Sequence, residues 1–425
     1  LDPDLERIDD SLKTQKTVKT LKRSLLQPPK HLQNRFIQND DIRSLIHLHS
    51  IITDLTIQYL WENNNLNKYP NITLVAVGGY GRAELHPHSD IDIMILLKDK
   101  SNTEINNNIS LFLTNLWDLG FDLGHSVRTI NECIVESKKD LSVITTLMES
   151  RAISGEKELF QLMKDSIKPN LLWSSKDFFI SKTNEQAQRH LHSSNAANKL
   201  EPNIKLSPGG LRDIQLINWV AKRHFQINEL SELINHNLLT KGQLKILHEG
   251  QSFLWRIRYG LHIIVQRRED RLLFDYQKSL ASMLGYEDAT FMLGVEQMMQ
   301  RYYRTVMDLS RINEMILQQF EELILASKKS FPIKVNASFQ IKNNYLEAIN
   351  DHIFKDNPSA LLELFLLLQK NSNLKGVSAN TIGLIKRNLH LINDEFRQQP
   401  KNHRLFLNII KAPEGVTHEL RRMNL

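Results

Sequence analysis

A glycine pair followed by two closely spaced aspartates, within residues 74–97, constrains the fold of this chain more than any other stretch. The segment LVAVGGYGRAELHPHSDIDIMILL predicts two short buried strands joined by a connection that contains glycine and proline. Residues two apart on a strand point to the same face, so Asp90 and Asp92 project together while Ile91 and Ile93 turn into the core. The second strand therefore begins with two carboxylates on one face.

Two neighbouring carboxylates repel each other, and a divalent cation relieves that repulsion. Hard oxygen ligands at close spacing favour Mg²⁺, which keeps part of its shell for water and substrate phosphates. Gly78 and Gly79 lack Cβ atoms, so their backbone N–H groups can approach a phosphate at the start of the following helix. Asp122 lies between two apolar residues and is a candidate third carboxylate, with Asp140 as its rival. The competing interpretation is a plain turn followed by a solvated strand end.

Composition narrows the class of protein. The length of 425 residues leaves room for two or three domains. No run approaches the roughly 18 uncharged apolar residues of a membrane span, so we expect a soluble chain without membrane contact. Cys133 is the only cysteine and the N-terminus resembles no secretion signal, which favours the cytoplasm. The net charge of +6 favours phosphate-bearing ligands without requiring nucleic acid.

The periodicity predicts an α+β chain in which a small mixed-sheet domain precedes helical domains. Apolar residues recur at three- and four-residue steps over 41–62, and 103–119 predicts a second helix before a strand candidate at 121–130. Pro28 and Pro29 are expected to interrupt any helix in the basic segment 1–40. Strand signals fade beyond about residue 140. We place a catalytic domain at 41–160, a helical nucleotide- or substrate-binding domain at 161–325 and a helical segment at 326–425.

The helical region supplies basic candidates for the same ligand. SPGG at 207–210 predicts a turn before a helix, with an apolar side made of Leu211, Ile214, Ile217 and Ala221 and a polar side that includes Arg212 and Trp219. We expect Lys205 and Arg212 near phosphates, and Trp219 near the base or a packing partner. The alternative is a capped helix with an ordinary solvated face.

Two further cation positions are candidates. Arg258 and His262 are four residues apart on a predicted helix, so they face one place, and Arg258 is the one we assign to the nucleotide. Arg82 follows the glycine pair by three residues and can approach a triphosphate. An ion pair between Arg82 and Glu84 is the competing explanation.

Taken together, these residues resemble the nucleotidyltransferases of the DNA polymerase beta superfamily. GGYGRAELHPHSDIDIMILL is similar to the catalytic domain of the bacterial PII uridylyltransferase/uridylyl-removing family. Further blocks match that family in order: GHSVRT, ESRAISG, LEPNIKLSPGGLRDIQLINWVAKRHF, FLWRIRYGLH and DRLLFDYQ. The resemblance runs from about residue 40 to the end, and the later blocks distinguish this family within the superfamily.

The resemblance implies a polymerase beta-like fold and a specific activity. The family transfers UMP from UTP to a tyrosine of the trimeric PII signalling protein, and removes it again when glutamine is plentiful. By the same resemblance Asp90 and Asp92 hold Mg²⁺, Gly78 and Gly79 contact the triphosphate, and Ser89 shapes the turn into the carboxylate strand.

Asp122 is assigned as the third carboxylate because it fits the superfamily's pattern of an acid between hydrophobic residues. The transfer requires no covalent intermediate, so Cys133 needs no nucleophilic role. The family's removal activity belongs to a His-Asp domain and its glutamine sensing to ACT domains. The dipeptide His-Asp does not occur in these residues, so we expect the transferase part alone, with residues 326–425 leading toward that domain.

Three alternative functions remain open from the amino-acid sequence alone. A related fold transfers AMP to glutamine synthetase, although SPGGLRDIQ and FLWRIRYGLH match the PII enzyme better. A non-catalytic nucleotide-binding or interaction module would use the aspartates only to hold a metal. Nucleic-acid binding is disfavoured because basic residues are scattered without an aromatic platform.

Overall fold

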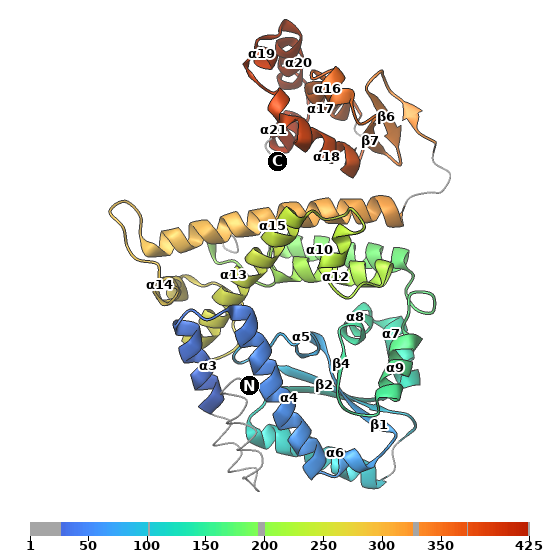
Figure 1. The fold of residues 1–425 in the computed structure, drawn as a ribbon, viewed down its shortest axis with the longest axis vertical. Coiled ribbons are helices and arrows are strands. Elements are labelled where there is room, and N and C mark those ends of the chain that lie inside the picture. Colours follow the sequence, from blue (N-terminus) through green and yellow to red (C-terminus); the bar gives the residue numbers. More distant parts are fainter. Residues whose placement is uncertain (1–26, 101–102, 194–199, 326–330, 372, 424–425) are drawn as a thin grey trace. The chain divides into compact units, whose positions relative to one another are not determined.

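The computed structural model describes residues 27–100, 103–193, 200–325, 331–371 and 373–423 (Figure 1). The chain divides into two compact units, residues 1–310 and 311–425. Most of the basic segment predicted for 1–40 lies outside the described residues. Each unit contains a four-stranded sheet and buried apolar residues of its own.

The sheet of the first unit is mixed and has the order β3-β2-β1-β4. Its strands are β1 Ile72–Ala76, β2 Ile91–Leu97, β3 Leu123–Thr129 and β4 Arg151–Gly155. The first three were predicted from the sequence, whereas β4 was not. β1 pairs antiparallel with β2 and β4, and β2 pairs parallel with β3. The expected fold class, a small mixed sheet followed by helices, is confirmed.

This topology brings three chain segments to one end of the sheet. The antiparallel pairing of β1 and β2 places the end of β1 beside the start of β2, and the parallel pairing places the start of β3 beside them. The short helix α5 Gly78–Gly81 leaves β1 at this end. The glycine pair and the predicted acids therefore share one end of the sheet.

Two of the helices around the sheet match the sequence prediction closely. They are α4 Ile42–Asn63 and α6 Thr103–Leu119. The side chain of Asp41 caps α4 by accepting a hydrogen bond of 2.9 Å from the backbone N–H of Ser44. Pro28 and Pro29 lie in the first turn of α3, which spans Gln27–Ile37, so this helix begins at the prolines; the segment before it, in which they were expected to interrupt a helix, lies outside the described residues. Backbone N–H groups there have no partner within the helix, so proline costs nothing.

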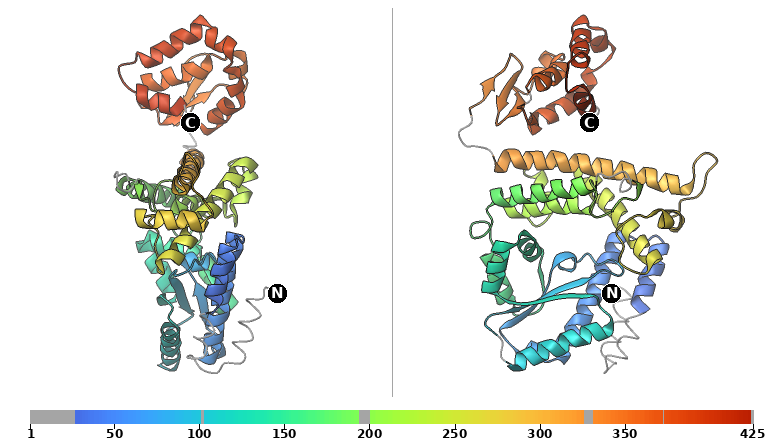
Figure 2. Two further views of the ribbon diagram at one scale, coloured as in Figure 1. Left: turned by 90° about the vertical axis from the view of Figure 1, so that its left-hand side faces the viewer. Right: turned by 180° about the vertical axis from the view of Figure 1, so that it is seen from behind.

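Helices α10, α12 and α13 lie beyond the end of the sheet at which α5 stands (Figures 1 and 2). The remaining helical elements of the first unit follow in chain order: η1 Leu66–Lys68, α7 Ile130–Lys139, α8 Leu141–Met148, α9 Lys157–Ser166, α10 Ser175–His192, α12 Leu211–Phe225, η2 Leu230–Ile234, α13 Lys241–Val265, α14 Phe274–Met283 and the first part of α15 Gly294–Ile324.

Helix α12 begins where the sequence predicts, and its predicted apolar side is buried at all four positions. The turn before it is fixed by Asp213, whose carboxylate accepts a hydrogen bond of 2.8 Å from the backbone N–H of Gly209. Asp213 is buried and also accepts from Gln186 on α10. Gly209 has a φ of +74°, which favours glycine. This network joins α12 to α10 and sets the position of the turn.

The second unit packs helices against a small sheet of order β5-β6-β7-β8. The helices α17 Ala360–Lys370 and α18 Ala379–Asn388 lie in the segment 326–425, for which helices were predicted. The strands were not predicted, although Asn343 and Asn344, both with positive φ, form a tight hairpin turn between β6 and β7. The elements are β5 Ile333–Lys334, β6 Phe339–Lys342, β7 Tyr345–Ala348, α16 Ile353–Asp356, α17, β8 Gly376–Val377, α18, η3 Leu389–Leu391, α19 Asp394–Gln398, α20 Pro400–Ile410 and α21 Val416–Met423.

Candidate functional site

The turn after β1 places backbone directly beside an aspartate. Gly78 has a φ of +59°, and a Cβ at this position would lie 3.1 Å from Oδ2 of Asp92. The backbone N–H of Val77 donates a 3.0 Å hydrogen bond to the carbonyl of Asp92, which fixes the turn against β2. Position 78 therefore requires glycine both for its conformation and for the space that the carboxylate occupies.

Three carboxylates gather at this end of the sheet, and we call Asp90, Asp92 and Asp122 the acidic edge. Asp92 pairs with Gly124 across β2 and β3, and the backbone N–H of Ile91 donates a 2.8 Å hydrogen bond to the carbonyl of Asp122. Burial, and then the negative charges of Asp90 and Asp122, raise the pKa of Asp92, although nearby cations oppose the shift. Mutual repulsion of this kind is what a bound cation would relieve.

The acidic edge offers oxygen donors of the kind that a divalent cation binds. The carboxylate of Asp92 lies between Gly78 and Gly124, and a Cβ on Gly124 would overlap its Oδ1. Oxygen donors from aspartate suit Mg²⁺. Within the described ranges, no three acidic, histidine or cysteine side chains are arranged as a ready-made metal site. Two aspartates would thus leave coordination positions for substrate oxygens and water.

One cavity of about 240 Å³ brings nine of the ten predicted site residues together, and we call it the nucleotide pocket. The predicted residues that line it are Gly78, Gly79, Arg82, Ser89, Asp90, Asp92, Lys205, Arg212 and Arg258. Asp122 does not line it, but lies close enough for its charge to act on Asp92. The rival acid Asp140 caps α8 by accepting a 2.7 Å hydrogen bond from the N–H of Ser142.

The side of the nucleotide pocket formed by the helical region is cationic, and we call Lys205, Arg212 and Arg258 the basic wall. Burial and the charges of Arg212 and Arg258 lower the pKa of Lys205 to about 8. Arg212 lies over the ring of Trp219, with 5.1 Å between its guanidinium carbon and the ring centroid. Concentrated positive charge of this kind prepares the pocket for an anion.

A partly buried acid holds Arg258 in place. Its Nε donates a 2.6 Å hydrogen bond to Oδ1 of Asp270, and its Nη1 lies 3.1 Å from Nδ1 of His86. Burial alone would raise the pKa of Asp270, but the imidazole of His262, whose Nε2 lies 3.8 Å away, and the ion pair with Arg258 hold it well below its usual range. His262 is fully buried and bonds the carbonyl of Pro87, so it supports the pocket from behind and does not line it.

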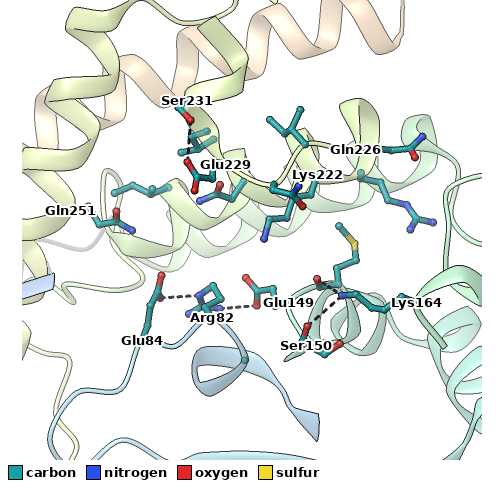
Figure 3. A pocket seen from close by; sticks show the side chains of 18 of the residues that line it. Arg82, Glu84, Glu149, Ser150, Lys164, Lys222, Gln226, Glu229, Ser231 and Gln251 are labelled. Atoms are coloured by element: carbon teal, nitrogen blue, oxygen red, sulfur yellow. Dashed lines mark hydrogen bonds and ion pairs between the residues drawn. The ribbon is translucent and has the colours of Figure 1, made fainter. Parts of the chain in front are cut away.

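Arg82 forms ion pairs and also lines the nucleotide pocket. Its Nε lies 2.8 Å from Glu84 and its Nη1 lies 2.7 Å from Glu149 (Figure 3). Glu149 is buried and also accepts a hydrogen bond from Nε1 of Trp219. Trp219 is therefore a packing and hydrogen-bonding partner of the pocket wall.

Other charged residues of the site were missed by the sequence analysis. Glu149, Lys182 and Glu185 line the pocket, and Asp270 supports it. Arg268 Nη1 lies 2.6 Å from Oδ2 of Asp90, at the end of the acidic edge. Glu149 and Asp270 each open a block that resembles the family, ESRAISG and DRLLFDYQ, and that resemblance was the signal that could have found them. Lys182, Glu185 and Arg268 lie in none of the matched blocks and reach the site only through packing of distant segments. Cys133 is buried beside Met94, and burial raises the pKa of its thiol to about 11.

Comparisons with known proteins divide the chain into three matched parts. Residues 61–153 match the nucleotidyltransferase domain model, residues 177–317 match the GlnD PII-uridylyltransferase model and residues 339–425 match the uridylyltransferase GlnD third domain. The acidic edge and the glycine turn lie within the first match, and the basic wall lies within the second. The prediction that the chain is a nucleotidyltransferase enzyme is confirmed.

Similar proteins are named bifunctional uridylyltransferase/uridylyl-removing enzymes. The one from Nitrosococcus oceani is 46% identical over 395 residues, which is 93% of this chain and 44% of that protein. The one from Stutzerimonas stutzeri is 45% identical over 404 residues, 95% of this chain and 45% of that protein. The chain thus spans a little under half the length of these relatives. Among the described helices, none is both long and apolar enough to cross a lipid bilayer.

Proposed function

Because this chain belongs to the PII-uridylyltransferase family, we propose that it transfers UMP from UTP to a tyrosine of a PII signalling protein and releases pyrophosphate. The observation that carries the proposal is one cavity lined by the glycine turn, by Asp90 and Asp92, and by the basic wall. Groups that bind anions lie in this cavity beside carboxylates that bind cations. A triphosphate with its metal ion requires both kinds of group. The choice of UTP as the nucleotide rests on the names of the relatives, which are uridylyltransferases.

The triphosphate is held from two directions in this proposal. The backbone N–H groups of Gly78 and Gly79 bind its terminal phosphates, because no Cβ intervenes. Lys205 and Arg258 neutralise its charge from the helical side, and Asp270 fixes the direction of the Arg258 guanidinium. Binding orients the α-phosphate toward the acidic edge, which contributes to rate through positioning.

The acidic edge performs the chemistry. Mg²⁺ held by Asp90 and Asp92 would supply Lewis-acid activation of the α-phosphate. The phenolic oxygen of the acceptor tyrosine attacks the α-phosphorus and forms a new P–O bond, while the bond to the β-phosphate oxygen breaks and pyrophosphate leaves with that electron pair. A free tyrosine has a pKa of about 10, so a base must remove its proton. We assign the carboxylate of Asp122 as that base.

The experiment is a transfer assay with the full chain, PII protein, Mg²⁺ and either UTP or ATP labelled at the α-phosphate. We expect label on a PII tyrosine from UTP, with activity reduced at least about 1,000-fold in Asp92→Asn because the metal ligand is lost. The matched control is Asp99→Asn, which changes an exposed aspartate beyond the end of β2 and retains activity. Transfer from ATP alone, or full activity in Asp92→Asn, would contradict the proposal.

A further inference from the structure

A second and larger cavity adjoins the nucleotide pocket. Its volume is about 980 Å³, within the range of ligand-binding cavities. It shares Arg82, Glu84, Glu149 and Trp255 with the nucleotide pocket. Figure 3 shows that elements of the sheet domain form its lower side and the helices of the helical region form its upper side. We call this space the rear cavity.

The charge of the rear cavity is positive. Its lining contains six lysine and arginine side chains but only three carboxylates. Two of those carboxylates, Glu84 and Glu149, are already paired with Arg82 (Figure 3). The cations are Arg43, Arg82, Lys164, Lys168, Lys222 and Arg223.

Several of these cations have partners within the protein. Lys168 pairs with Asp165 at 2.7 Å, and Arg223 donates to the carbonyls of Ile167 and Trp173. Arg43 lies over the ring of Trp255, at 5.3 Å from its centroid. Arg43 and Arg223 keep their charge because these partners are neutral, so the excess positive charge lies on Arg43, Arg223, Lys164 and Lys222. Of these, Lys164 and Lys222 are the two ammonium groups, and their charges act on each other.

Lys164 holds its ammonium group at a fixed place in the rear cavity. Nζ donates to the carbonyls of Leu147 and Met148, at 3.1 and 2.9 Å, where α8 ends. These acceptors are neutral, and within the described residues Lys164 forms no ion pair with a carboxylate. Burial and the charge of Lys222 lower the pKa of Lys164 to about 8. The protein has therefore oriented a cation without neutralising it.

Lys222 brings a second cation to the same space from the opposite side. It projects from α12 into the rear cavity above Lys164, which belongs to α9 (Figure 3). Its side chain is half-buried, and within the described ranges it forms no ion pair. Two ammonium groups from different elements thus repel each other across a polar cavity, which an anion between them would relieve.

We propose that the rear cavity is a second oligophosphate-binding site, formed around Lys164 and Lys222, that receives the pyrophosphate released from the nucleotide pocket. The proposal rests on the proposed function for the identity of the anion. Arg82 lines both cavities and follows the glycine turn, which binds the terminal phosphates in the proposed function. The pyrophosphate is therefore released next to Arg82, where the two cavities adjoin. Ammonium groups are suitable ligands for phosphate oxygens.

Isothermal titration of the full chain with inorganic pyrophosphate tests this proposal without requiring activity. We expect two sites in the wild-type chain, one in each cavity. Lys222→Gln should weaken one site at least about 10-fold, which corresponds to about 1.4 kcal/mol. Lys205→Gln, in the nucleotide pocket, should weaken the other site by a similar factor. Lys222→Arg retains the charge and should retain both sites.

Lys245→Gln is the matched control, because it removes an exposed lysine on α13 that does not line either cavity. A single site that weakens in Lys205→Gln and is unchanged in Lys222→Gln would overturn the proposal. If pyrophosphate binding is lost in Lys222→Gln but the wild-type chain transfers no UMP, the rear site stands and the proposed function fails. Thermal unfolding of each variant shows that the fold is retained.

Discussion

The acidic edge and the basic wall form two sides of one cavity, but the chain builds them by different means. The acidic edge consists of short side chains held by strand pairing, with Asp92 placed between two glycines. The basic wall consists of long side chains from the turn before α12, from α12 itself and from α13. Short side chains on paired strands cannot adjust, whereas long ones can. We therefore expect substitutions at the edge to change the chemical step most, and substitutions at the wall to change binding.

The largest effect should follow from adding one methyl group at Gly124, beside the acidic edge. In Gly124→Ala the new Cβ overlaps Oδ1 of Asp92, and the carboxylate must move. A displacement of about 1 Å at a reacting group costs about 100-fold in rate, so we expect kcat for transfer to fall by at least that factor. The KM for UTP should change little because the basic wall is untouched.

Gly383→Ala is the control for that variant. A Cβ at Gly383, within α18, meets nothing within 4 Å. Alanine there should leave kcat unchanged and leave stability equal or slightly higher, because glycine is unfavourable within a helix. If Gly124→Ala retained wild-type kcat, the assignment of Asp92 to the chemical step would be wrong.

Asp90 and Asp92 of the acidic edge were also the part of the site that the sequence could predict. Strand alternation alone puts Asp90 and Asp92 on one face, and the glycine pair marks the turn that approaches them. These are relations between residues close in the chain, so no knowledge of tertiary packing was needed. The strand β1 and the helices α4 and α6 were predictable for the same reason, since β1 is a short apolar run and the two helices have a strong apolar periodicity.

A second test concerns how the basic wall is positioned. Arg223 of α12 is buried and donates hydrogen bonds of 2.6 Å to the carbonyl of Ile167 and 2.8 Å to that of Trp173. Arg223→Gln leaves the buried carbonyl of Ile167 and the partly buried carbonyl of Trp173 without their donors, and each unsatisfied buried group costs about 1–3 kcal/mol. We expect the free energy of unfolding to fall by about 2 kcal/mol in urea titrations.

The adjacent residue provides the comparison for this variant. Lys222 has the same charge but forms no ion pair among the described residues, so Lys222→Gln should change the free energy of unfolding by less than about 0.5 kcal/mol. Equal losses in Arg223→Gln and Lys222→Gln would mean that charge alone, and not the two carbonyl contacts, holds α12 in place.

A smaller effect is expected where the basic wall contacts the ligand. Arg258→Gln removes one cation from the nucleotide pocket and leaves the acidic edge intact. We expect the KM for UTP to rise about 10-fold, equivalent to about 1.4 kcal/mol, with kcat nearly unchanged. Arg267→Gln removes an exposed arginine that does not line the pocket, and its KM should match the wild type. A fall in kcat with constant KM would place Arg258 with the chemical step instead.

The residues that support the basic wall and Arg82 are the part of the site that the sequence could not predict. Asp270 and Glu149 act through contacts with Arg258 and Arg82, residues far away in the chain, and no spacing announces such partners. The strand β4 has the sequence RAISG, in which Ile153 is the only large apolar residue, so it carries little strand signal although it is as long as β1. The strands β5 to β8 contain two to four residues each and fall below the length at which alternation is recognisable.

The smallest effect should come from the titration of His49, on α4. Burial, followed by the charge of His88, lowers the pKa of His49 to about 4, and its buried Nδ1 has no hydrogen-bond partner among the described residues. In the unfolded chain a histidine titrates near 6.5, so between that pH and 4 the unfolded state binds more protons. This contribution to stability is complete above pH 6.5 and is lost as the pH falls toward 4, amounting to about 1 kcal/mol between pH 8 and 6. Urea titrations at both pH values should show that loss in the wild type and a smaller one in His49→Gln. His47→Gln, an exposed position on the same helix, should retain the wild-type difference. If it flattens the pH dependence as much as His49→Gln does, the imidazole of His49 is not the source of that dependence.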